Sequence, residues 1–191
     1  MKMTLLAILT IALTAPTFAQ FTVQQEPRPK HFSYTPPHRS FTCEVPTGWQ
    51  PFEEETLQGT AVHFLGPAEA DGAFRAAVHV HFIQRGRPGF VPIDAAVKRE
   101  RRSDSQTSRD ASPIVFWRAA RAQARRFEVS ETRQIPRDVL PSHPVQLHHY
   151  YVFIPAGESY FMIKLSSTRD TYLNYKPEFE RLLSTFQVTG F

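Results

Sequence analysis

Residues 145–166 read VQLHHYYVFIPAGESYFMIKLS. Two runs rich in aromatic and β-branched side chains, 145–154 and 159–166, flank the segment PAGE at 155–158. Runs of this composition favour β-strands, and a short glycine-containing segment between them is typical of a β-hairpin. The stretch therefore predicts two adjacent antiparallel strands in the core of a sheet.

Three further strands are predicted between residues 41 and 84. Phe41, Cys43 and Val45 alternate with polar residues, and a turn at 46–49 then ends in Trp49. Residues 60–65 (TAVHFL) and 74–84 (FRAAVHVHFIQ) form the next two strands, on either side of a Gly-, Pro- and Asp-rich loop at 66–72. Cys43 is the single cysteine of the chain, so an intramolecular disulfide is excluded, and we interpret it as a small core residue.

Two segments change to helical spacing. Residues 91–101 place apolar side chains on one face of a helix. Near the C-terminus an apolar stripe runs from Tyr172 to Phe186, and we expect Asn174 and Pro177 in the first turn of that helix. Each helix must bury its stripe against the sheet.

The segment 118–130 is compatible with two structures. Its alanines favour a helix, whereas the continuation into Arg-Phe-Glu-Val-Ser favours a strand, which is our prediction. Residues 103–113 and 132–144 are predicted loops. The predicted order is β-β-β-α-β-β-β-α, which indicates the α+β class: an αβα sandwich with a central antiparallel sheet of about six strands and two principal helices.

The N-terminus has the pattern of an export signal. A lysine at position 2, an apolar run from Leu5 to Leu13 and the small-x-small sequence Thr17-Phe18-Ala19 predict a signal peptide over residues 1–19. We expect a proline-rich extended lead-in at 20–39 and one domain at 40–191. The mature protein is then extracytoplasmic, either periplasmic or secreted, with no transmembrane segment after cleavage.

The order of the predicted elements resembles that of a known family. The strand ending in VPTGW at 45–49, the strand closing on FLGP at 64–67, the His/Val-rich strand and the C-terminal Tyr/Phe/Leu helix are similar to PsbP-like proteins. The resemblance covers roughly residues 40–188. It implies an αβα sandwich and a non-enzymatic role in binding or assembly, with an unidentified protein or envelope component as partner. It carries over no site residues and does not support a role in photosystem II.

Histidines are the candidates for a metal site. His79 and His81 alternate and so share one face of their strand, while His63 and His149 lie on other predicted strands. Two imidazoles at this spacing and a third from elsewhere can bind zinc or copper. The alternative is that these side chains cover a half-exposed sheet face or hydrogen-bond beneath a helix.

Basic residues form a second candidate site. Six of them are candidates for a patch that binds anionic lipid, a cell-wall polymer or an acidic protein: Lys98, Arg99, Arg101, Arg102, Arg121 and Arg125. The alternative is a solvated surface, because on one strand Arg121 and Arg125 would point away from Arg118 and Arg126. The net charge of +4 is modest, and we expect no nucleic-acid partner.

No catalytic motif is present in the sequence. The acidic run Glu53-Glu54-Glu55 is predicted as a solvated loop edge, and the chain has no Gly-x-Ser-x-Gly elbow, phosphate-binding loop or dinucleotide fingerprint. We therefore expect an exported non-enzymatic binding or accessory protein of the cell envelope, with no cofactor. The alternative is a small extracytoplasmic metal-binding protein or enzyme that uses the histidine-lined sheet face.

Overall fold

The computed structural model describes residues 30–68, 74–103, 108–136 and 141–189. The predicted signal peptide and the first half of the predicted lead-in, residues 20–29, lie outside these residues. Within them, no helix has both the length and the apolar character needed to cross a membrane.

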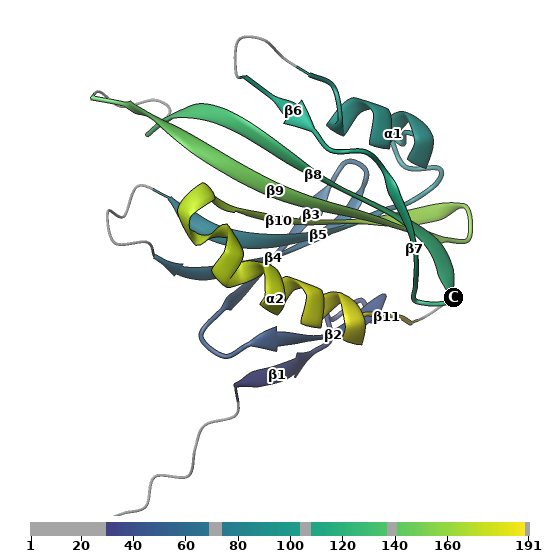
Figure 1. The fold of residues 1–191 in the computed structure, drawn as a ribbon. Helices are drawn as coiled ribbons and strands as arrows, with labels where there is room; N and C mark the ends of the chain where they lie inside the picture. Colours follow the sequence, from purple (N-terminus) through teal and green to yellow (C-terminus); the bar gives the residue numbers. More distant parts are fainter. Residues whose placement is uncertain (1–29, 69–73, 104–107, 137–140, 190–191) are drawn as a thin grey trace, which may run out of the picture.

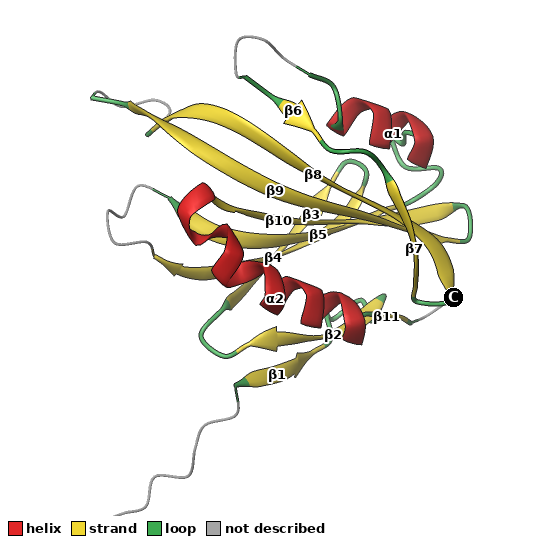
Figure 2. Ribbon diagram, in the orientation of Figure 1, coloured by secondary structure: helices red, strands yellow, loops and turns green. Residues whose placement is uncertain are grey.

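An eight-stranded antiparallel sheet forms the centre of the fold (Figures 1 and 2). Its spatial order is β3-β4-β5-β10-β9-β8-β6, and β7 also pairs with β8. The strands are β3 (Gln50–Thr56), β4 (Gly59–Ala68), β5 (Arg75–Ile83), β6 (Asp110–Ala111), β7 (Val115–Ala119), β8 (Ala122–Ile135), β9 (His143–Ala156) and β10 (Ser159–Thr168). The predicted hairpin at 145–166 is confirmed as β9 and β10, which lie in the middle of the sheet.

A smaller sheet and two helices complete the layers. The small sheet has the order β1-β2-β11, formed by β1 (His31–Tyr34), β2 (Phe41–Pro46) and β11 (Gln187–Val188). Helix α1 (Ile93–Glu100) covers one face of the large sheet, while α2 (Arg169–Thr185) and the small sheet cover the other (Figure 1).

Two apolar cores result from this layering. On the α2 side, Phe161 stacks on Phe82 with ring centroids 4.6 Å apart, and Phe179 of α2 packs edge-on against Tyr150. On the α1 side, Ala96 and Val97 of the helix pack on a group of sheet residues: Phe127, Val129, Tyr151 and Phe153. The α+β class is confirmed, and the sheet is larger than the six strands predicted.

The extra strands lie at sheet edges. Residues 53–55, predicted as a loop edge, belong to β3, which is paired with β4 on one side only and keeps its side chains exposed. Similarly, β1 lies inside the predicted lead-in and pairs with β2, so the folded region begins ahead of residue 40. Edge strands rich in polar residues lack the buried alternation on which sequence prediction depends.

The strand prediction for 118–130 is confirmed, but the chain reverses within it. Ala120 and Arg121 adopt positive φ angles of 47° and 66° and connect β7 to β8. Both segments predicted as loops also contain strand residues, because β6 lies within 103–113 and the ends of β8 and β9 extend into 132–144. The side chains at the ends of β8 and β9 do not alternate in polarity. These ends are stabilised instead by the long hydrogen-bonded ladder between the two strands.

The C-terminal helix begins earlier than predicted. Residue Arg169 is its first residue, so Pro177 lies in the helix interior and not in the first turn. A proline there removes the hydrogen bond to the carbonyl of Leu173, whose side chain is 74% exposed. Water can reach that side of the helix, which lowers the cost of the missing bond.

Candidate metal centre

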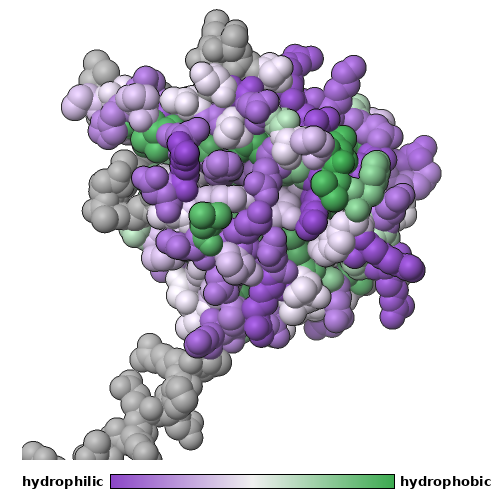
Figure 3. Space-filling view, viewed as in Figure 1, coloured by the Kyte–Doolittle hydropathy of each residue, from purple (hydrophilic) through white to green (hydrophobic). Residues whose placement is uncertain are grey.

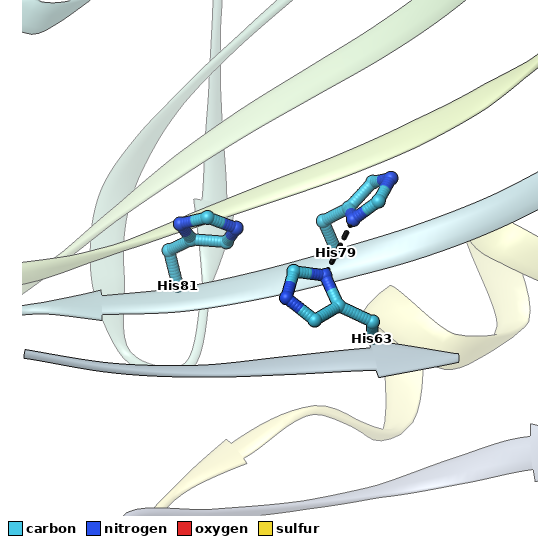
Figure 4. A group of neighbouring side chains, drawn as sticks. All are labelled: His63, His79 and His81. Atoms are coloured by element: carbon cyan, nitrogen blue, oxygen red, sulfur yellow. Dashed lines mark hydrogen bonds between the residues drawn. The ribbon is translucent and has the colours of Figure 1, made fainter. Parts of the chain in front are cut away.

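Three histidines meet on one face of the large sheet. The antiparallel register of β4 and β5 places His63 opposite His79 and Ala61 opposite His81. Because His79 and His81 are two residues apart, both point to the face on which His63 lies. One nitrogen from each ring lies within 4.8 Å of the other two (Figure 4).

The cluster lies on the α1 side of the sheet. His79 lies opposite Lys164 on β10, and Lys164 lies opposite Tyr151 on β9, so the three side chains share one face of the sheet. Tyr151 belongs to the core beneath α1. The histidines are therefore on the same face as α1 but two strands beyond the β8–β9 region where the helix packs. They remain partly accessible, with 15% of the His63 side chain exposed.

A chain of hydrogen bonds connects a carboxylate to two of the rings. His63 Nε2 lies 3.3 Å from Oε2 of Glu54, which belongs to β3, and His63 Nδ1 lies 2.6 Å from His79 Nδ1. When the Nε2 proton is donated to the carboxylate, Nδ1 of His63 carries a lone pair. The Glu54 carboxylate thus selects the tautomer in which His63 offers Nδ1 as a ligand atom.

Burial keeps His79 and His81 uncharged. Loss of solvation, together with a smaller contribution from the positive charge of Lys164, lowers the pKa of His79 to about 2. Loss of solvation likewise lowers the pKa of His81 to about 4, with a smaller contribution from His63. Metal ions bind the neutral imidazole, so the two rings are in the required state at neutral pH.

The three imidazoles fit a small divalent metal ion after a short rearrangement. Zinc–nitrogen bonds of about 2.0–2.1 Å in tetrahedral geometry separate two ligand nitrogens by about 3.3 Å. The His63–His79 nitrogen pair, now 2.6 Å apart, would have to spread slightly, and His81 would move inward. The Nδ1 atom that His79 directs at His63 would also transfer its proton to Nε2. These are side-chain adjustments and require no change in strand register.

The fourth predicted ligand, His149, lies outside this group. Its Nδ1 accepts a hydrogen bond from Ser166 Oγ at 2.9 Å, and its Nε2 donates to Glu131 Oε1 at 3.2 Å. Glu131 is 2% exposed and also pairs with Arg109 and Arg133. Burial alone would raise the pKa of Glu131, but the bond from His149 and the neighbouring positive charges lower it to about 2. His149 therefore belongs to a buried polar network.

The predicted basic residues are only partly brought together. Lys98, Arg101, Arg102 and Arg125 line one groove beside α1. Arg99 instead pairs with Glu100, and Arg121 lies in the turn after β7 and lines a separate hollow that also includes Arg118.

The reversal at this turn changes which arginines share a face. Arg118 lies opposite Gln123, two positions along the ladder from the Phe116–Arg125 pair, so the two pairs lie on the same face. Arg118 and Arg125 therefore point to the same side of the sheet, contrary to the single-strand expectation. Arg126 points to the other side, where it donates a hydrogen bond to the Tyr150 hydroxyl.

The fold has counterparts among solved structures. It is similar to the crystal structure of a Pseudomonas aeruginosa protein of unknown function, with a TM-score of 0.53 and 15% identity over 85% of this chain and 100% of that chain. It is also similar to the solution structure of CyanoP, the cyanobacterial PsbP of Synechocystis, with a TM-score of 0.51 and 14% identity over 84% of this chain and 93% of that chain. The chain has a PsbP-like fold. The sequence matches no protein-family model and no curated protein.

Two residues near the histidines were not identified from the sequence. Glu54 was predicted to be solvated, and Lys164 was not considered. Phe52 and Glu54 are two residues apart, so a strand at this position would place both on one face. In the structure they lie opposite His63 and Ala61. Lys164 is recognisable only from the β5–β10 register.

Proposed function

We propose that this PsbP-like protein is an exported, non-enzymatic accessory protein of the cell envelope that binds a zinc or copper ion through His63, His79 and His81. The observation that supports this most strongly is the convergence of three imidazole nitrogens within 4.8 Å on a rigid pair of antiparallel strands. Export is supported by the signal-like pattern of residues 1–19.

Binding is favoured over catalysis by the position of the carboxylate. A hydrolytic metal site requires a free general base beside the metal-bound water. Glu54 hydrogen-bonds His63 and so orients a ligand of the metal. Imidazole ligands suit both zinc and copper, and the general order of affinities predicts tighter binding of Cu²⁺ than of Zn²⁺.

The charge of Lys164 makes the proposal more specific. This side chain lies opposite His79, with its ammonium group 5.8 Å from the ring centroid of Tyr151. Its positive charge opposes a bound cation. Replacement of Lys164 by methionine, which keeps a similar length, is therefore expected to increase the affinity for the metal.

Isothermal titration of tag-free, metal-free protein with Zn²⁺ and with Cu²⁺ tests the proposal. We expect one ion per chain, a loss of binding in His63→Gln and His81→Gln, and a loss of about 10- to 100-fold in Glu54→Gln, as for other groups that orient ligands. His143→Gln is the matched control, because His143 is exposed on β9. Absence of stoichiometric binding at micromolar metal, or an equal loss in His143→Gln, would contradict the proposal.

A further inference from the structure

A groove lies between α1 and β7, on the histidine side of the large sheet but toward its opposite edge. Its volume is about 440 Å³. It is lined by Asp94, Val97, Lys98, Arg101, Arg102, Ser103, Ile114, Phe116 and Arg125. In Figure 3, apolar surface is seen where α1 and β7 adjoin, bordered by hydrophilic side chains.

The apolar part of the groove is formed by Val97, Ile114 and Phe116. Val97 is buried as part of the core beneath α1, and Ile114 packs against the same core. Phe116 projects further and is 59% exposed. A large aromatic ring left in water beside two aliphatic side chains is a surface on which an apolar ligand can be buried.

The rim of the groove is basic, and two of its cations are held in place by the protein. Arg125 pairs with Asp94 at 2.5 Å. Arg101 donates a hydrogen bond to the backbone carbonyl of Ser112 at 3.0 Å and places its guanidinium group over the ring of Phe127. These contacts fix the positions of positive charge at one side of the groove before any ligand arrives.

The other two cations are free to contact a ligand. In the part of the chain that the structure describes, the side chains of Lys98 and Arg102 have no hydrogen-bond or ion-pair partner, and both are exposed. Cations at the end of α1 also complement the helix dipole. Interaction with the helix dipole alone does not require exposed apolar side chains between α1 and β7.

We propose that this groove binds an anionic amphiphile, a molecule with a phosphate or carboxylate head and an apolar chain. Lys98 and Arg102 would contact the head, supported by the charge of Arg101, while the chain would lie against Ile114 and Phe116. Arginine and lysine are the side chains that best bind such heads. The volume falls within the range of about 300–1,000 Å³ that is typical of small-molecule sites. A free inorganic anion would leave Ile114 and Phe116 in contact with water. An uncharged apolar molecule would leave Lys98 and Arg102 without an anionic partner.

Titration calorimetry with four probes below their micelle concentrations tests the inference. The probes are dodecyl phosphate, dodecanoate, dodecyl maltoside and inorganic phosphate. We expect the two anionic amphiphiles to bind with one molecule per chain, and at least roughly tenfold more tightly than the other two. Comparable binding of dodecyl maltoside would indicate an unspecific apolar patch, and comparable binding of inorganic phosphate would indicate a simple anion site. Either result would overturn the proposal.

Variants locate the binding. The double variant Lys98→Gln/Arg102→Gln is expected to weaken dodecyl phosphate binding by roughly tenfold or more, and Phe116→Ser to weaken it while leaving any weak phosphate binding unchanged. Arg75→Gln/Arg87→Gln is the control, because it removes the same charge from exposed positions that do not line the groove. An equal loss in this control would show that only net charge matters and would refute the site. Circular dichroism verifies that each variant is folded.

Discussion

Acidification of the metal-free protein provides a direct measure of the burial of His81. The pKa of His81 is about 4 in the folded chain, mainly because burial disfavours the imidazolium, against about 6.5 when unfolded. Between these two values the unfolded chain binds a proton that the native chain excludes. The free energy of unfolding therefore decreases as the pH falls from about 6.5 to 4, by about 1.4 kcal/mol per pH unit for this group.

The size of the effect follows from this interval. A change from pH 7 to pH 5 removes about 2 kcal/mol of stability through His81, and solvent at the half-buried ring makes this an upper limit. The charged and titratable groups that act on the ring are His63 and Lys164, which lower its pKa, and Glu54 and Glu100, which raise it. None of these carboxylates compensates for the loss of solvation.

Urea unfolding at pH 7 and pH 5 is the assay, performed on wild type, His81→Gln and the exposed control His143→Gln. Glutamine is polar but does not titrate, so the His81→Gln variant should lose about 2 kcal/mol less than wild type over this interval. The control should lose as much as wild type. An equal pH dependence in all three proteins would refute the reasoning, because it would mean that His81 takes up its proton as readily in the folded chain as in the unfolded one.

Three further predictions concern the scaffold. Phe161→Ala, at a fully buried position between the sheet and α2, should cost about 3–5 kcal/mol in urea unfolding. Gly59→Ala should be strongly destabilising, because its Cβ would lie 2.1 Å from the backbone oxygen of Phe82, whereas Gly157→Ala, with nothing within 4 Å, should cost only about 1 kcal/mol for its left-handed conformation. Equal costs at the two glycines would contradict this account. Glu131→Gln should weaken the buried network. It should also reduce the loss of stability between about pH 4 and pH 2, because the pKa of the native carboxylate is lowered to about 2. An unchanged acid unfolding profile in this variant would exclude this role.

Several features of the PsbP-like fold were predictable from local patterns. The hairpin at 145–166, the strands around Phe41 and His79 and both helices follow from periodicity, because each buries one side of a locally regular element. The edge strand β3 was missed because most of its side chains remain in contact with water, and β1 was missed because it is a four-residue strand between Pro29 and Pro36 in the proline-rich segment. The spacing of His79 and His81 also indicated, without any structure, that both rings share a face.

The sequence by itself determined the class of the fold, the centre of the sheet and the candidate histidines. Only the tertiary structure decided which residues meet. Pairing of β4 with β5 brings His63 to His79 and leaves His149 in a buried network with Glu131. The reversal after β7 combines part of the basic residues with Phe116 in one groove. The physical reason is that strand order and register depend on long-range packing of the two cores, whereas periodicity reports only on which side of its own element a residue lies.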